Sequence, residues 1–304
     1  MLNESEYFEP IDPDEKNDEC IAIESKSFFK DVCERFVKNK RAMIALVIFL
    51  IIALMAIFGP MISPYSYDGM DTAIMNQRPS AAHWFGTDRF GRDLFTRVLY
   101  GARISLMVGI VTAVINTIIG VIYGGIAGYV GGRVDMWMMR LTDILYSIPE
   151  LLYIILIMLI FGSNVRSIII GVCVAGWISM ARMVRSQIIT LKEQEFALAA
   201  FVLGANSRRI LFKHLIVNSL GTIIVTVTLM IPQAIFMEAF LSFVGVGISA
   251  PMASLGTLAQ DARTYLEIFP YQMLFPVAAI CVTIFSLNFI GEGLNSALNP
   301  KGKR

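Results

Sequence analysis

Long uncharged runs alternate with charged segments along this chain of 304 residues. Two of the runs, residues 42–62 and 104–130, are each long enough to cross a hydrocarbon core of about 30 Å as a helix. Four weaker runs, each shorter or next to a charge, lie at residues 144–161, 167–181, 215–237 and 268–291. We therefore predict an all-α, polytopic membrane protein with six transmembrane helices.

The segment TLKEQEFALAAFVLGANSRRILFKH, at residues 190–214, lies between two of these runs and has a helical pattern of its own. Thr190 and Glu193 have the spacing of a capping box, which predicts that a helix begins there. Gly204 stands where that helix is expected to end. A second helix is expected to follow, with Asn206 or Ser207 as its cap.

The first of these helices is apolar on every side. The apolar stretch at residues 196–203 spans about 12 Å as a helix, which is too short to cross a bilayer. It is also too apolar to lie bare in water, so we predict that a partner subunit covers it. Packing on the chain's own spans or resting among lipid headgroups remain alternatives. Four of its residues fall at i, i+3, i+4 and i+7, and they are Phe196, Ala199, Ala200 and Leu203.

Composition and charge give the class and the orientation. The chain is 56% hydrophobic with a mean hydropathy of +0.66, which is typical of an integral membrane protein. Lysine and arginine are concentrated in the segments that share a side with both termini and with residues 190–214, so the positive-inside rule places these in the cytoplasm. Residues 63–103 are then extracytoplasmic. The cluster from Arg89 to Arg103 runs against the rule.

The ends of the chain have distinct compositions. The acidic residues 1–28 lack an apolar core, so they predict a disordered cytoplasmic tail and not a signal peptide. The pattern FFKDVCERFVKNKR that follows indicates either an amphipathic helix on the membrane surface or a solvated lead-in. The expected divisions are the tail, a lead-in with the first span and the extracytoplasmic segment at 29–101, a five-helix domain at 102–296, and a cytoplasmic C-terminus at 297–304.

Known catalytic and phosphate-binding motifs are absent from the sequence. There is no phosphate loop, no H-E-x-x-H and no G-x-S-x-G, and the histidines are His83 and His214. We expect no catalytic residue, no metal site and no ATPase site in this chain, and no nucleic-acid partner. The cysteines, for which we expect no disulfide, are Cys20, Cys33, Cys173 and Cys281.

Glycines and prolines predict how the spans pack and bend. Gly120, Gly124 and Gly128 form a smooth face on the second span, which favours close packing within the bundle over a contact with another subunit. Pro149 and Pro232 remove helical hydrogen bonds and are expected to bend their spans.

Three acidic residues lie at or near the ends of spans, where an unpaired charge is costly. Asp143, Glu150 and Glu238 could line a translocation path and hold the amine of a substrate, or they could pair with an arginine. We favour Glu238 for the path, because the other two lie closer to basic neighbours or to the interface.

Residues 190–218 resemble the cytoplasmic "EAA" loop of permease subunits in binding-protein-dependent ABC importers, and most closely that of oligopeptide and dipeptide permeases. The loop reads EFALAAFVLGAN followed by RILFKHLIVN. Leu198, Phe201 and Val217 replace the glutamate, arginine and proline of the motif, so docking is expected to depend on shape and apolar burial. The matching residues are Glu195, Ala199, Ala200, Leu203, Gly204, Ala205, Arg209, Ile210, His214 and Asn218.

The resemblance covers residues 28–300 in order. HWFGTDRFGRDLFTRVLYGARISLMVG from His83, LSFVGVGISAP from Leu241 and NFIGEGLNSALNP from Asn288 are similar to further signatures of the C-type subunit of peptide permeases. The departures are Leu255, where tryptophan is common, and Ala250, where the first of two prolines is.

The resemblance implies a type I ABC importer fold in the cell membrane. It implies a heterodimer with a homologous second permease subunit, two ATP-binding cassette subunits that bind ATP and Mg²⁺, and an extracytoplasmic solute-binding protein. The substrate would be oligopeptides or dipeptides, with nickel complexes or glutathione as alternatives. A six-span secondary transporter is less favoured, because it leaves the apolar loop unexplained. The residues that would couple to the ATPase are Glu195, Leu198, Ala199, Ala200, Leu203, Gly204 and Ala205.

Overall fold

The computed structural model of the protein describes residues 28–298. The predicted tail lies outside the described residues except for Phe28, where the first helix begins. The predicted C-terminal stretch starts inside the last helix, which runs to Leu298. The described residues are helical and contain no strand, apart from one isolated bridge between Thr87 and Asp93. This agrees with the predicted all-α class.

Five helical stretches are long and apolar enough to cross a membrane. They are α2 (Lys40–Ile62), α3 (Leu94–Val130), α6 with α7 (Val165–Leu191), α9 through α10 (Ser207–Val244) and α12 (Tyr271–Leu298). A sixth span is obtained when α4 (Gly132–Tyr146) and α5 (Glu150–Phe161) are counted together, with a bend of 74° between them. Counted in this way, the predicted number of six spans is confirmed.

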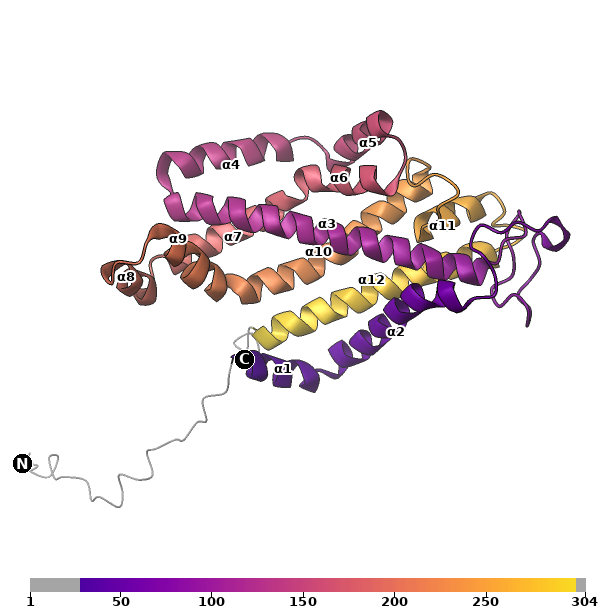
Figure 1. The fold of residues 1–304 in the computed structure, drawn as a ribbon, viewed down its shortest axis with the longest axis horizontal. Coiled ribbons are helices and arrows are strands. Elements are labelled where there is room, and N and C mark those ends of the chain that lie inside the picture. The colour runs from indigo at the N-terminus through magenta and orange to yellow at the C-terminus, as the bar shows by residue number, and fades with distance from the viewer. Residues whose placement is uncertain (1–27, 299–304) are drawn as a thin grey trace, which may run out of the picture.

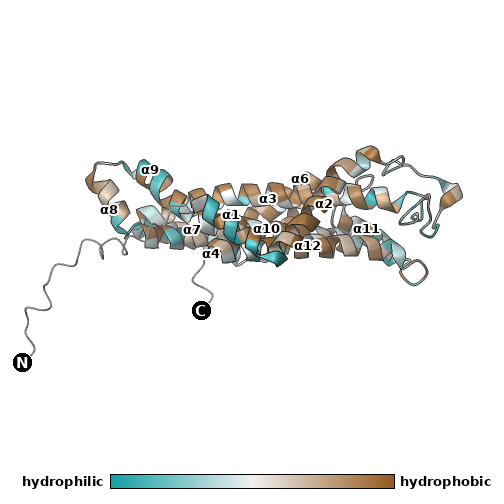
Figure 2. Ribbon diagram, turned by 90° about the horizontal axis from the view of Figure 1, so that it is seen from below, coloured by the Kyte–Doolittle hydropathy of each residue, from teal (hydrophilic) through white to brown (hydrophobic). Residues whose placement is uncertain are grey.

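The remaining elements lie at the two ends of the bundle (Figure 1). Helices α8 and α9 project from one end, and the irregular residues 63–93, here called the outer segment, lie at the other. Figure 2 shows apolar residues along the length of the bundle between them. The shorter elements are α1 (Phe28–Lys38), η3 (Thr72–Ile74), α8 (Glu195–Val202), α9 (Ser207–Arg209), the π-helical turn η4 (Ile210–Leu215) and α11 (Leu255–Arg263).

The first helix confirms the helical interpretation of the lead-in. It carries an ion pair between Asp31 and Arg35 on an exposed face. Its other face packs on α12 and α2, and Phe36 lies close to Gly293 of α12. The lead-in is therefore attached to the bundle along part of its surface.

Several spans are longer than their hydropathy predicts, and α3 and α7 show why. Helix α3 begins at Leu94 and not near residue 104, because Asp93 caps it by accepting a hydrogen bond from the backbone N–H of Thr96. Helix α7 continues beyond the predicted end at residue 181, since its arginines find partners on α4. Arg182 pairs with Asp143, and Arg185 pairs with Asp135.

The two prolines behave differently. Pro149 directly precedes α5 at the 74° bend, so the predicted break in the third span is confirmed. Pro232 is buried inside α10, which continues without interruption from Ile216 to Val244. The bend expected at Pro232 stays a prediction.

The glycine face of α3 packs against α7. A Cβ atom at Gly124 would lie 2.1 Å from the carbonyl oxygen of Ala181, and one at Gly128 would lie 2.8 Å from that of Arg185. One at Gly120 would meet the side chain of Met180. These close approaches confirm packing within the bundle.

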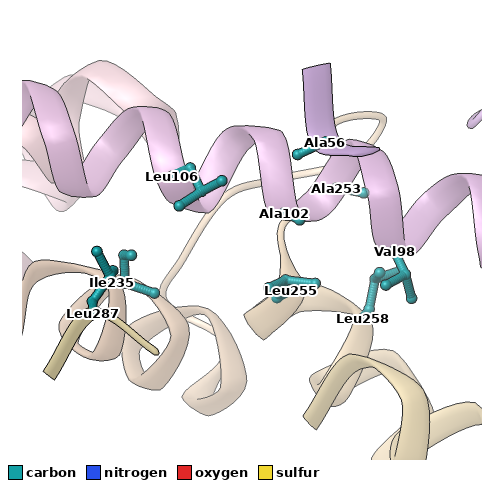
Figure 3. Packing of buried hydrophobic residues seen from close by; sticks show 9 residues of the cluster. All are labelled: Ala56, Val98, Ala102, Leu106, Ile235, Ala253, Leu255, Leu258 and Leu287. Atoms are coloured by element: carbon teal, nitrogen blue, oxygen red, sulfur yellow. The ribbon is translucent and has the colours of Figure 1, made fainter. Parts of the chain in front are cut away.

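A buried apolar cluster joins the helices at the outer half of the bundle (Figure 3). Its members come from α2, α3, α10, α11 and α12, together with the segment that precedes α11. The cluster consists of Ala56, Val98, Ala102, Leu106, Ile235, Ala253, Leu255, Leu258 and Leu287. Burial of these side chains stabilises the packing of α2, α3, α10, α11 and α12 against one another.

The glycine face makes a direct prediction. Gly124→Ala should destabilise the protein by about 1–3 kcal/mol, because its Cβ would collide with the backbone of α7. The matched control is Gly125→Ala on the same helix. Its Cβ would lie 3.6 Å from the side chains of Ile216 and Leu211, which is an ordinary contact. Thermal unfolding in detergent should show a lower midpoint for the first variant alone, and equal midpoints would contradict the packing.

Candidate functional site: an exposed apolar helix and a polar cavity

Helix α8 begins later than the capping box predicts. Thr190 belongs to the last turn of α7, where its hydroxyl donates to the carbonyl of Ser186. The N-cap of α8 is Gln194, and its side chain makes no capping bond. The predicted start at Thr190 is therefore wrong. The extra turn of α7 is held by Lys192, which donates through Nζ to the carbonyl of Gly128 on α3.

The end of α8 agrees with the prediction. Gly204 has a φ of +80°, which glycine adopts without strain. Asn206 then caps α9 by accepting a hydrogen bond from the backbone N–H of Arg209. The chain thus turns sharply between two helices, and the turn depends on a residue without a Cβ.

The two faces of α8 have different surroundings. Ala197 and Ala200 are buried against an apolar cluster formed by α7, η4 and α10. Leu198, Phe201 and Leu203 are 63%, 67% and 87% exposed. Packing on the chain's own helices thus accounts for one face, and the other face stays uncovered within the described part of the chain.

The predicted coupling residues are divided between these faces. Ala200 points to the protein, whereas Ala199 and Leu203 are exposed, so the i, i+3, i+4, i+7 set does not form one buried stripe. Glu195 is exposed in the first turn, and Ala205 is half-buried after the turn. The exposed surface is centred instead on Leu198, Phe201, Val202 and Leu203.

A polar cavity of about 420 Å³ lies among α3, the α4–α5 bend, α6, α7 and α10. Its volume is within the range of small-molecule sites. Five polar side chains line it from five different helices, and they are Asn116, Tyr146, Glu150, Ser179 and Gln233. Because the bend at Pro149 forms part of the wall, the broken span and the cavity are one feature.

Glu238 does not lie in this cavity. Its side chain is 0% exposed, and it accepts hydrogen bonds from Ser105 at 2.7 Å and from Ser242 at 2.9 Å. The hydroxyl of Ser254 in turn contacts that of Ser242 at 3.4 Å. The structure therefore places Glu238 in the packing between α3, α10 and the segment before α11, and its assignment to a path stays a prediction.

The other two acids have opposite surroundings. Asp143 pairs with Arg182 at 2.9 Å, and both side chains are largely exposed. This is the arginine pairing that the sequence left open as an alternative. Glu150 lines the polar cavity in the first turn of α5 and makes no hydrogen bond or ion pair with any residue that the structure describes.

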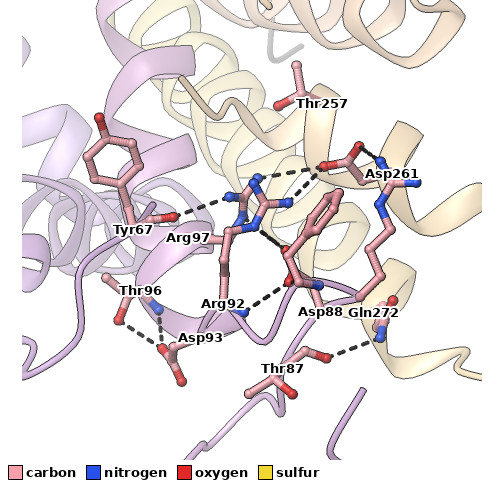
Figure 4. A network of polar contacts seen from close by, with 12 residues as sticks. Tyr67, Thr87, Asp88, Arg92, Asp93, Thr96, Arg97, Thr257, Asp261 and Gln272 are labelled. Atoms are coloured by element: carbon pink, nitrogen blue, oxygen red, sulfur yellow. Dashed lines mark hydrogen bonds and ion pairs between the residues drawn. The ribbon is translucent and has the colours of Figure 1, made fainter. Parts of the chain in front are cut away.

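A buried ionic cluster holds the outer segment to the bundle (Figure 4). Asp88 accepts from Nε of Arg92 at 2.6 Å, and both side chains are buried. Arg97 and Arg92 each approach Asp261 of α11, at 3.6 Å and 3.5 Å. Arg97 also donates to the carbonyl of Tyr67. Two of the arginines that ran against the positive-inside rule, Arg92 and Arg97, are thus paired with acids of the same cluster.

Two further contacts attach the outer segment. His83 lies 2.9 Å from Asp93, the cap of α3. Gln272 of α12 donates to Asn76 and to the carbonyl of Thr87. Sequence reasoning missed this cluster, because Asp261 and Gln272 are remote in the chain. The dense alternation of acids and arginines in TDRFGRDLFTR was the available signal.

The part of the chain that the structure describes contains no candidate metal site and no disulfide. There is no group of three or more His, Cys, Asp or Glu side chains placed to hold a metal ion among residues 28–298. Cys33, Cys173 and Cys281 are free, and Cys20 lies outside the described residues.

A bundle of six candidate spans, with a cavity at a broken helix and an apolar helix exposed at one end, defines a polytopic membrane protein. A family model described as binding-protein-dependent transport system inner membrane component matches residues 120–304. One described as N-terminal TM domain of oligopeptide transport permease C matches residues 27–79. The chain belongs to this family of transport system inner membrane components, which have the type I ABC importer fold.

Three relatives extend the match over nearly the whole chain. The oligopeptide transport system permease protein OppC of Bacillus subtilis (strain 168) is 48% identical over 97% of this chain and 96% of its own. The dipeptide transport system permease protein DppC of the same organism is 47% identical over 95% and 92%. The OppC protein of Escherichia coli (strain K12) is 45% identical over 94% and 95%. The chain is thus similar to multi-pass permease components of peptide transporters.

The ionic cluster predicts a large effect for one substitution. Asp88→Ala should destabilise the protein by about 3–5 kcal/mol, because it leaves Arg92 and Arg97 buried with less compensating charge. The control is Asp143→Ala, which breaks an exposed ion pair and should cost about 0–1 kcal/mol. Thermal unfolding of both variants in detergent checks this difference. Equal losses would show that the cluster contributes no more than a surface pair.

Proposed function

We propose that this chain is the C-type permease subunit of an ATP-driven importer for oligopeptides or dipeptides. The observation that carries the proposal is the 48% identity with a permease of that printed function over 97% of this chain. The exposed apolar face of α8 supports it independently, because such a face needs a protein partner.

The proposed complex supplies what this chain lacks in sequence. Two ATP-binding cassette subunits bind ATP and Mg²⁺ and dock on α8, so this chain is a permease without an ATPase site. A homologous second permease completes the translocation path, and a solute-binding protein delivers the substrate at the outer segment. In this arrangement both termini and α8 face the cytoplasm of a cell whose plasma membrane holds the complex.

In this proposal α8 couples the ATPase subunits to the spans by moving as a rigid body. Its exposed side chains, Leu198, Phe201 and Leu203, enter a groove of the ATPase, as in other helix-in-groove contacts. Its buried side chains, Ala197 and Ala200, pack on α7 and α10, so a displacement of α8 is passed to two spans. Closure of the ATPases then shifts the balance between inward-open and outward-open states.

The path in this proposal follows the polar cavity. The cavity borders the bend at Pro149 between α4 and α5. It also borders Gln233, which is exposed on α10. Broken helices border the binding sites of many transporters. The second permease subunit would close the cavity from its open side.

The proposal is tested by reconstitution. The chain, its second permease and the ATPases are purified together in proteoliposomes, and ATP-dependent uptake of radiolabelled di- and tripeptides is measured with the solute-binding protein present. Uptake that requires ATP and all subunits is the expected result. A purified chain that brings no ATP-binding subunit with it would contradict the proposal.

Two substitutions test the coupling helix. Ala199→Asp places a charge on the exposed face, and Gly204→Pro cannot adopt the φ of +80° at the turn. Each should lower uptake by roughly ten-fold or more, with less ATPase recovered in the purified complex. Membrane insertion should be unchanged.

The matched control is Thr190→Ala, because Thr190 lies in α7 and does not cap α8. This variant should transport at the normal rate. Normal transport by Ala199→Asp, with the ATPase still bound, would remove α8 from the coupling mechanism.

A further inference from the structure

The polar cavity contains a carboxylate without a partner. Glu150 lies in the first turn of α5 and is half-buried, and no residue that the structure describes donates to it. A nearby acid on α4, Asp143, is paired with Arg182, as is Asp135 with Arg185. A charged carboxylate at this depth is costly unless a cation or several donors approach it.

A second acceptor without a partner is buried beside the cavity. The side chain of Asn116 on α3 is 3% exposed, and its Oδ1 has no hydrogen-bond partner among the described residues. The amide packs against the backbone of Gly176, where a Cβ would lie 2.4 Å from Nδ2. This oxygen has less than 1 Å² of accessible surface, so it does not reach the open space of the cavity.

The remaining lining favours a cation over an anion. The described residues that line the cavity include no lysine, arginine or histidine, so nothing in this wall would bind a carboxylate by charge. Ser179 and Gln233 add hydroxyl and amide groups that can accept further hydrogen bonds. A primary ammonium group has three donors and a positive charge, which suits one carboxylate beside hydroxyl and amide oxygens.

We propose that Glu150 forms a subsite for the primary ammonium group of a peptide in transit. The inference rests on the proposed function, since it takes the cavity as part of the translocation path and names the group of the peptide that binds there. The cavity also offers Met230 and Met237, whose flexible side chains suit neighbouring residues of many shapes. The subsite therefore recognises the ammonium that different peptides share.

The ammonium can come from the amino terminus or from a lysine side chain, and three fluorescent tripeptides separate these sources. The first has a free amino terminus, the second is acetylated there, and the third is acetylated but contains a lysine. Each is labelled at its carboxyl end. Binding is measured by anisotropy with the purified permease–ATPase complex in the absence of the solute-binding protein, so that the latter does not decide the result.

The wild-type complex should bind the free tripeptide about ten-fold more tightly than the acetylated one. Glu150→Gln should remove this preference, and Glu150→Asp should retain part of it. The control Asp143→Asn should bind as the wild type does, because Asp143 pairs with Arg182 outside the cavity lining. Tight binding of the acetylated lysine peptide assigns the ammonium to the side chain, and weak binding assigns it to the amino terminus.

Equal binding of free and acetylated lysine-free peptides by the wild type would overturn the inference, as would an unchanged preference in Glu150→Gln. If Glu150→Gln fails to assemble, the partial loss in Glu150→Asp decides the same question. ATP-dependent uptake is measured in parallel with the wild-type complex and the solute-binding protein. Peptide uptake without the ammonium preference would leave the proposed function standing, whereas absence of uptake would refute that function itself.

Discussion

The close contact between α3 and α7 connects the functional features of this protein. Gly124 and Gly128 bring the two helices together so closely that a single methyl group at Gly124 would collide with the backbone of α7. Helix α3 begins at the ionic cluster, contributes Asn116 to the cavity and meets α7 along its glycine face. Helix α7 leads directly into α8. The exposed helix and the cavity are therefore joined by tightly packed elements.

Charge is handled differently at the two ends of the bundle. At the outer end, buried arginines are neutralised by Asp88 and Asp261, and this pairing fixes the outer segment and α11 to α3. At the other end, the exposed face of α8 is apolar, and Leu198 and Phe201 point outward where the related motif carries charges. The first end is stabilised within the chain, whereas the second leaves an apolar surface uncovered by the described residues.

Several features could be predicted from the sequence because they depend on neighbouring residues. The break before α5 follows from Pro149, and the turn after α8 follows from Gly204 and Asn206. The glycine spacing predicted a close helix contact, although not that α7 would make it. Hydropathy placed the six spans but ended them at the first charged residue. Arg97 and Arg185 lie within longer helices, because acids from other elements compensate them.

By itself, the sequence determined the six apolar spans, the helix that is too short to cross a membrane, and the family, since all three depend on local order along the chain. The tertiary structure decided which acidic side chain has no hydrogen-bond or ion-pair partner among the described residues. Glu238, the favoured candidate for the path, is enclosed by Ser105 and Ser242, while Glu150 faces the cavity. Burial and hydrogen-bond partners come from residues far apart in sequence, so no local pattern could distinguish these two carboxylates.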